Sequence, residues 1–190
     1  AVGSSGWNAS QGNESGDNGK IEILLGNSTS GFDCLNPWWV VAGNSGEALG
    51  WKLEAIAGMN GDGFADLAAV AANHSIIVAT IPNEIVHKGK IAIYEGTASS
   101  MEHVRNITQT QESTLLGRSL SGSGDLNGDG RPDLIVAQSK ARPRLYLNTL
   151  GQTGLRLSLS GPTGNPLGQG ATARAVFADG FKGAARLVGG

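Results

Sequence analysis

An internal repeat constrains the fold of this chain more than any other feature. Segment 60–67 reads Asn-Gly-Asp-Gly-Phe-Ala-Asp-Leu and returns at 127–134 as Asn-Gly-Asp-Gly-Arg-Pro-Asp-Leu, a shift of 67 residues. The pair Leu49-Gly50 returns with the same shift as Leu116-Gly117, and segment 19–26 returns at 89–96. A weaker copy of the last segment lies at 144–148. Elements that keep nearly one period indicate structural units arranged in series.

The repeated units contain short stretches with the character of β-strands. Segments 67–71 and 134–137 are apolar runs bounded by turn residues, as buried strands are, and segments 21–24 and 91–94 follow a Gly-Lys turn. Glycine makes up 30 of the 190 residues, which suits many tight turns rather than helices. We therefore predict an all-β fold, in which units of about four short antiparallel strands form propeller-like blades.

Loop 125–133 has the composition of a cation-binding loop. Oxygen-bearing side chains stand at its first, third, fifth and ninth positions (Asp125, Asn127, Asp129 and Asp133), and Arg131 offers its main-chain carbonyl at the seventh. Calcium takes about six to eight oxygen ligands, and a glycine at the sixth position permits the sharp turn. Neighbouring carboxylates repel one another without a counter-charge, so a cation is expected. The alternative is an Asn/Asp/Gly-rich turn that holds no ion.

The earlier copy of this loop, at 58–66, is less complete. Gly58 stands where the later copy has Asp125, while Asn60, Asp62, Asp66 and the carbonyl of Phe64 remain. Because one carboxylate is missing, this loop is expected to bind calcium more weakly, to use a water molecule, or to stay empty. An EF-hand is excluded for the later loop, because its twelfth position is Val136 rather than glutamate.

At these residues the chain resembles the FG-GAP repeat of integrin α-subunit propellers and of bacterial secreted proteins. Leu49-Gly50 and Leu116-Gly117 stand in place of the Phe-Gly pair. The resemblance implies FG-GAP repeats over 1–150, partial at 1–48, full at 49–115 and partial at 116–150. It also implies Ca²⁺ ligands at Asp125, Asn127, Asp129, Arg131 and Asp133, and less completely at Asn60, Asp62, Phe64 and Asp66.

Residues 151–190 no longer follow the period. An alternating stretch at 155–159, a turn cluster at 161–165, an apolar run at 171–177 and an Asp179-Gly180 hairpin turn succeed one another. This order resembles the start of an ASPIC/UnbV-type β-module, which is expected to be incomplete at residue 190. Segment 168–173 imitates a dinucleotide-binding fingerprint, but no βαβ unit surrounds it, so a turn is predicted there.

Five asparagines occupy Asn-x-Ser/Thr sequons. They are Asn8, Asn13, Asn27, Asn73 and Asn106. Their number favours a glycosylated surface in a secreted protein, although a chain rich in serine and threonine produces such matches by coincidence.

The single cysteine and a tryptophan pair give weaker expectations. Cys34 has no internal partner, so we predict a buried small hydrophobe, with a link to another chain as the alternative. Trp38 and Trp39 would face opposite sides of a strand, one in the core and one exposed. Core packing or a subunit interface is favoured over a sugar-stacking platform.

Charge and motif content argue against several functions. The net charge of −2 gives no electrostatic reason for nucleic-acid binding, and no apolar run approaches the roughly 20 residues of a membrane span. His74, His87 and His103 are scattered, and the sequence has no Gly-x-Ser-x-Gly elbow. The calcium loops account for the dense carboxylates, so we predict that the chain is not an enzyme.

The leading hypothesis is an extracellular, calcium-stabilised structural or adhesive protein at the cell surface. A closed propeller needs about four blades, and the sequence offers fewer. Either the chain is part of a longer polypeptide, or its open strand edges pair with other copies and build a filament or surface layer. Glycans and surface proteins are further candidate partners. The alternative is a non-catalytic FG-GAP binding module of a larger secreted or enzyme-linked protein.

Overall fold

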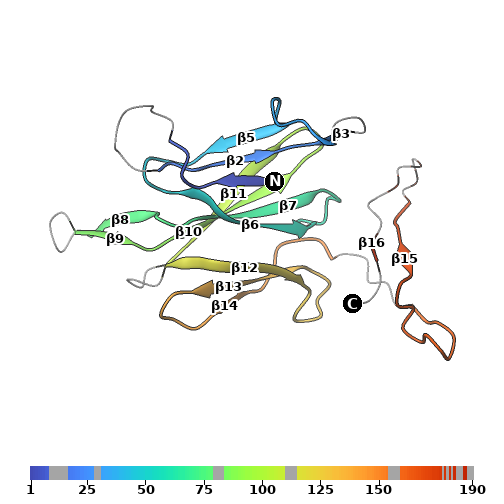
Figure 1. The fold of residues 1–190 in the computed structure, drawn as a ribbon. Helices are drawn as coiled ribbons and strands as arrows, with labels where there is room; N and C mark the ends of the chain where they lie inside the picture. The colour runs from blue at the N-terminus through green and yellow to red at the C-terminus, as the bar shows by residue number, and fades with distance from the viewer. Residues whose placement is uncertain are drawn as a thin grey trace. The chain divides into compact units, whose positions relative to one another are not determined.

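The computed structural model describes residues 1–8, 17–27, 31–78, 84–109, 115–153, 159–176, 178, 180, 182 and 186–187. The chain divides into two compact units, 1–154 and 155–190. In the described residues the regular elements are all β-strands, which confirms the predicted all-β class (Figure 1). These strands do not close into a barrel or a complete propeller. The described part also has no helix long and apolar enough to cross a membrane.

Three antiparallel sheets form the larger unit. The first sheet has the order β1-β2-β5, with β1 (Val2–Ser4), β2 (Lys20–Ile23) and β5 (Trp39–Ala42). The second has the order β6-β7-β10-β11, with β6 (Leu49–Ala57), β7 (Ala65–Ala71), β10 (Lys90–Gly96) and β11 (Met101–Thr108). The third has the order β12-β13-β14, with β12 (Leu116–Gly124), β13 (Asp133–Gln138) and β14 (Arg144–Tyr146).

Two short hairpins branch from these sheets. One is formed by β3 (Gly26–Asn27) and β4 (Gly31–Phe32), and the other by β8 (Ser75–Val78) and β9 (Glu84–His87). The β8–β9 hairpin lies between β7 and β10 in the sequence but pairs only with itself in the described sheets.

The sequence repeat is also a structural repeat. Leu67 of β7 lies opposite Tyr94 of β10, and Leu134 of β13 lies opposite Tyr146 of β14. By the same correspondence β1, β2 and β5 match β7, β10 and β11. Within the described residues, only the second sheet therefore has four strands. Among the described strands, the first sheet has no counterpart of β6 and the third has no counterpart of β11.

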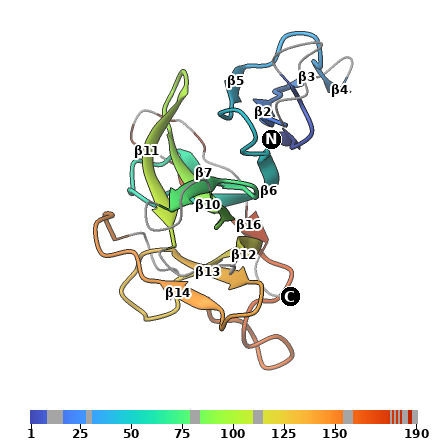
Figure 2. The same ribbon diagram turned by 90° about the vertical axis from the view of Figure 1, so that its left-hand side faces the viewer.

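The three sheets pack face to face, and the second sheet lies between the others (Figures 1 and 2). Alternate residues of β7 explain why its sequence is apolar throughout. Leu67 and Ala69 pack in the core shared with the first sheet, whereas Ala68 and Val70 pack in the core shared with the third. All four are at most 4% exposed. A strand buried on both faces loses the polar alternation of a half-exposed strand.

A backbone hydrogen bond, here called a joint, connects the second sheet to the first, and another connects the third sheet to the second. The amide of Leu49, at the start of β6, donates to the carbonyl of Asn18 before β2 at 3.0 Å. The amide of Leu116, at the start of β12, donates to the carbonyl of Lys88 before β10 at 2.9 Å. Both leucines are buried, and each lies in the core beneath its joint. The Leu-Gly pair of the repeat therefore positions consecutive sheets.

The glycine of each pair adopts a backbone conformation that other residues avoid. Gly50 and Gly117 both have a φ of 90°. A Cβ atom on Gly117 would lie 2.7 Å from both γ-carbons of Val70. Only glycine permits both the conformation and the close approach of the two sheets.

The smaller unit contains one short described hairpin. β15 (Thr172–Ala173) pairs with β16 (Arg186–Leu187), and an isolated bridge joins Val176 to Lys182. This pairing puts a reversal of the chain where the Asp179-Gly180 turn was predicted, although Asp179 itself lies outside the described residues. Of the turn predicted at 168–173, residues 168–171 form one, in which the amide of Ala171 donates to the carbonyl of Gly168 at 3.0 Å. The prediction is wrong for the last two residues, which form β15. Of the strand predicted at 155–159, residues 155–158 lie outside the described part.

Two predictions about single side chains are wrong. Cys34 is exposed rather than buried, because it lies in a turn in which the Asp33 carboxylate accepts hydrogen bonds from the amides of Leu35 and Asn36. Trp38 and Trp39 do not divide between core and solvent, because both are partly buried and pack against the core of the first and second sheets. Side chains alternate between the two faces of a sheet only within a strand, and Trp38 lies outside β5, which begins at Trp39.

Candidate cation-binding loops

The two predicted loops occupy equivalent places in neighbouring sheets. Loop 58–66 connects β6 to β7, and loop 125–133 connects β12 to β13. Because the first two strands of each sheet are antiparallel and the sheets stack in register, both loops emerge at the same end of the larger unit. The structure thus places the two groups of predicted ligands at the same end of neighbouring sheets.

The side chain of Asp125 organises the later loop. One of its carboxylate oxygens accepts hydrogen bonds from the amides of Gly128 at 2.6 Å and Asp129 at 3.0 Å, and the other accepts from Gly130 at 2.7 Å. Three backbone donors therefore face one negative charge. This arrangement curls the chain tightly around Asp125 and leaves the loop exposed.

A second set of contacts repeats in both loops. The carboxamide oxygen of Asn127 accepts from the amide of Asp129 at 3.1 Å, and Asp129 accepts from the amide of Arg131 at 2.9 Å. In the earlier loop, Asn60 accepts from Asp62 at 3.0 Å, and Asp62 accepts from Phe64 at 2.8 Å. Both loops thus share one local conformation. The earlier loop lacks the contacts of Asp125, since Gly58 replaces it, and the side-chain contacts of Arg131, since Phe64 replaces it.

Asp66 and Asp133 have a structural role that the loop pattern did not predict. They are 2% and 1% exposed. One oxygen of Asp133 accepts from the amide of Leu126 at 2.8 Å, and the other accepts from the amide of Asn148, beyond β14, at 2.9 Å. Each aspartate therefore joins the start of its loop to the third strand of its own sheet.

The contacts of Asp66 are equivalent to those of Asp133. Asp66 accepts from the amides of Met59 and of Gly96, the last residue of β10. Burial raises the pKa of Asp66 above its usual value, although these two hydrogen bonds oppose that rise. No motif marks residues 96 and 148 as partners, so only the tertiary structure reveals them.

Asp129 has a different environment, because it is partly exposed at the outside of the loop. The hydrogen bond from the side chain of Asn127, 3.1 Å long, lowers the pKa of Asp129, and the nearby Arg131 acts in the same direction with a 3.4 Å ion pair. Asp129 is therefore fully ionised at neutral pH and available as an anionic ligand.

The donor chemistry of loop 125–133 fits calcium. Its oxygens are carboxylate, carboxamide and carbonyl groups, which a hard cation prefers. Oδ2 of Asp125 and Oδ1 of Asp129 each accept one hydrogen bond in the described part of the chain, from Gly130 and Arg131, so each has a lone pair left for a cation. The described residues contain no group of three histidine, cysteine, aspartate or glutamate side chains gathered as a metal centre. The assignment of Asp125, Asn127, Asp129, Arg131 and Asp133, and of Asn60, Asp62, Phe64 and Asp66, as calcium ligands remains a prediction.

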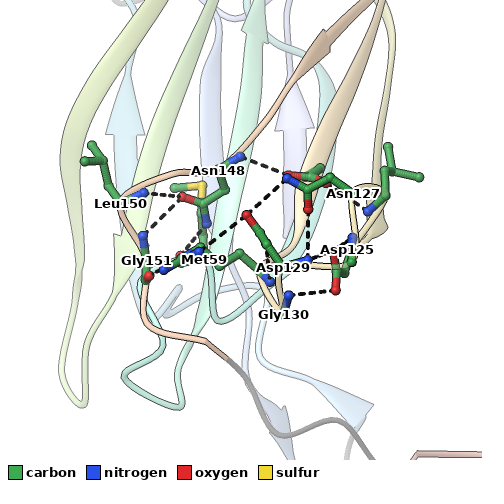
Figure 3. A network of polar contacts seen from close by, with 12 residues as sticks. Met59, Asp125, Asn127, Asp129, Gly130, Asn148, Leu150 and Gly151 are labelled. Atoms are coloured by element: carbon green, nitrogen blue, oxygen red, sulfur yellow. Dashed lines mark hydrogen bonds and ion pairs between the residues drawn. The ribbon is translucent and has the colours of Figure 1, made fainter.

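Segment 148–152 connects the two loops (Figure 3). The backbone amide of Asn148 donates to Asp133, while its side-chain amide donates to the carbonyl of Met59 at 2.7 Å. Further along, the amide of Gln152 donates to the carbonyl of Asn60 at 3.2 Å, and the side chain of Arg131 donates to the carbonyl of Gly151. One short segment thus contacts both loops.

A cavity of about 490 Å³ lies beside this segment, between the second and third sheets. β11 and the stretch after β14 form much of its wall, with Val104, Ile107, Leu147 and Leu150 among its apolar residues. In the second sheet, β11 pairs with β10, and the third sheet has no described strand at the equivalent position beside β14. The cavity therefore adjoins an exposed sheet edge.

At the opposite end of β10, a buried carboxylate holds three chain segments together. One oxygen of Glu47, just before β6, accepts from Lys90 at 2.7 Å and contacts the imidazole of His74 at 2.8 Å. Its other oxygen accepts from the amide of Asn44 at 3.1 Å. Burial alone would raise the pKa of Glu47, but these hydrogen bonds outweigh it and hold the pKa at about 2. No local motif marks this cluster, because its members are far apart in the chain.

The sequons differ in what the structure describes. Asn73 and Asn106 are exposed, Asn8 is partly buried, the side chain of Asn27 is not described, and Asn13 lies outside the described residues. Exposure permits glycosylation at Asn73 and Asn106, which remains a prediction.

Comparison with known families supports the repeat. The FG-GAP repeat matches residues 116–141, which comprise β12, the loop 125–133 and β13. A search of curated proteins found no match. The matched segment thus supports the FG-GAP repeat family and favours a non-catalytic binding or adhesion module.

Proposed function

We propose that this chain is a calcium-stabilised structural or adhesive module that acts outside the cell and has no catalytic role. The repeated conformation of the two loops carries the proposal. Each loop presents carboxylate and amide oxygens at the same end of stacked sheets, and the later loop adds the three-amide contact of Asp125. A cation there would be held by Asp125, Asn127, Asp129, the carbonyl of Arg131 and Asp133. It would supply positive charge that joins β12 to β13.

Calcium dependence of stability tests this proposal. Asp129→Ala should lower the melting temperature by about 5 °C in calcium and leave it nearly unchanged in chelator, because a ligand stabilises only the state that binds it. The measurement is thermal unfolding by circular dichroism with and without calcium. Glu102→Ala removes an exposed carboxylate on β11 and should change neither value. Equal losses for Asp129→Ala in both conditions would exclude Asp129 as a metal ligand.

Association with further copies is the second part of the proposal. Ile135 and Leu145 of the third sheet occupy the positions that Ala68 and Ile93 occupy in the second sheet. Ala68 and Ile93 are buried, because the third sheet packs against them. Ile135 is 36% exposed and Leu145 is 51% exposed, so the outer face of the third sheet repeats an apolar contact surface without a described cover. We infer that self-association uses this face together with the edge of β14.

The remaining parts of the proposal concern partners, location and an alternative function. Glycans or surface proteins are candidate ligands, and glycosylated asparagines would suit an extracellular location. A non-catalytic module of a larger secreted or enzyme-linked protein is the alternative function, and residues 151–190 would then begin an ASPIC/UnbV-type module. Nucleic acid is not proposed as a partner, since the net charge is −2.

A further inference from the structure

We propose that segment 148–152 couples the two loops, so that ordering loop 125–133 with calcium also orders loop 58–66. This inference rests on the proposed calcium function and concerns how its two candidate sites regulate each other. The coupling residues are Asn148 and Gly151. Neither belongs to a predicted ligand set, and neither was selected from the sequence.

The first observation is the double contact of Asn148 (Figure 3). Its amide donates to Asp133, the last residue of the later loop, at 2.9 Å. Its side-chain amide donates to the carbonyl of Met59, in the earlier loop, at 2.7 Å. The side-chain oxygen accepts from the amides of Leu150 and Gly151 at 3.3 Å each, which fixes the side chain in this orientation. A displacement of Asp133 is therefore transmitted to Met59 through one residue.

The second observation is the close approach of two backbones. A Cβ atom on Gly151 would overlap the carbonyl oxygen of Met59, and a Cβ atom on Gly61 would overlap the side chain of Gln152. Gly151 is buried, and its carbonyl accepts a hydrogen bond from the side chain of Arg131 in the later loop. Packing and hydrogen bonding thus connect the same two loops independently of Asn148.

The direction of coupling follows from the difference between the loops. Loop 125–133 has Asp125, whose three amide contacts give it a compact conformation, whereas loop 58–66 has Gly58 at that position. Loop 125–133, which has the additional carboxylate, would bind calcium first. The carbonyls of Met59 and Asn60 in loop 58–66 accept hydrogen bonds from segment 148–152. Calcium in loop 125–133 would order this segment, and part of the entropy cost of ordering loop 58–66 would then be met before that loop binds calcium. Coupling between sites typically changes affinity about fivefold or more.

Amide hydrogen exchange of peptides covering the two loops, measured across a calcium titration, tests the coupling. In the unmodified chain, both loops should gain protection with one shared calcium midpoint. In Asn148→Ala and Gly151→Ala, loop 58–66 should need at least about fivefold more calcium than loop 125–133. Leu150→Ala is the matched control, since its side chain is 75% exposed and only its backbone joins the network, and it should keep the shared midpoint.

The outcomes separate the coupling from the calcium function. Two midpoints that already differ in the unmodified chain, or that stay together in both variants, would overturn the coupling and leave calcium binding intact. Absence of calcium-dependent protection from both loops of the unmodified chain would overturn the calcium function and the coupling with it. Circular dichroism of each variant in chelator verifies the fold, and the two variants disrupt the link by independent means.

Discussion

At the scale of single residues, buried aspartates and glutamates do more in this molecule than their motif positions indicate. The loop pattern places Asp66 and Asp133 at the ninth position of a cation loop, and the structure adds contacts to Gly96 and Asn148 that the pattern does not contain. Glu47 belongs to no motif, yet it connects Asn44, His74 and Lys90. Such partners come from the pairing of strands within one sheet, which brings residues far apart in the sequence together and which local spacing does not encode.

Glu47 makes the stability of the molecule depend on pH. Its pKa is about 2 in the folded state, below the ordinary value of 4.5, so its contribution is present above about pH 4.5 and disappears as the pH falls toward 2. Glu47→Gln should therefore lower the free energy of unfolding by roughly 3 kcal/mol at pH 7, and by much less at pH 3. Urea unfolding at the two pH values measures this difference.

A surface ion pair provides the control for that experiment. Glu22 contacts Lys20 at 2.9 Å, but both side chains are about a quarter exposed, at 24% and 23%. Glu22→Gln should change the free energy of unfolding by less than about 1 kcal/mol. If Glu47→Gln shows the same small effect at both pH values, the buried cluster does not stabilise the fold.

At the scale of elements, the sequence predicted strands best where both faces are buried. Segment 67–71 lies within β7 and segment 91–94 lies within β10, because continuous apolar runs bounded by turns permit few other structures. Prediction was weakest where a residue stands next to a strand rather than in it. Trp38 and Cys34 were interpreted by rules for strands or for burial, whereas turn geometry decides their environment.

The Leu-Gly joint leads to a prediction at this scale. Gly117→Ala should lower the free energy of unfolding by about 3 kcal/mol, because the new Cβ would require a strained backbone at φ 90° and would press on Val70. Differential scanning calorimetry of the variant measures the loss. Gly6→Ala is the control, because nothing lies within 4 Å of its added Cβ, and it should be nearly neutral. A neutral Gly117→Ala would mean that the second and third sheets do not meet as tightly as the structure has them.

At the scale of the whole molecule, the outer face of the third sheet repeats a face that is buried in the second sheet. The sequence predicted that units would be left open, but it assigned association to strand edges alone. The structure adds the sheet face that contains Ile135 and Leu145, which could be identified only after register placed them opposite each other on β13 and β14.

Association can be tested without disturbing the loops. The double change Ile135→Lys with Leu145→Lys should abolish concentration-dependent self-association, because charges on a contact face resist desolvation. Sedimentation velocity over a range of concentrations measures the assembly state. Leu35→Lys makes the same chemical change at a 90% exposed residue outside the sheets and should leave association intact. A chain that sediments as a monomer before any substitution would contradict self-association.

The β8–β9 hairpin shows how such a repeat can gain length without loss of register. The carbonyl of His74 accepts hydrogen bonds from the amides of Lys88 and Gly89, at 3.0 and 3.3 Å, so the hairpin leaves and rejoins the second sheet at almost one point. In the third sheet, residues 139–143 join β13 to β14 without any hairpin. The packing of the sheets therefore does not determine how many residues connect the second strand of a sheet to the third. Evolution can use it as a free variable, and a protein engineer can use it to display a foreign epitope.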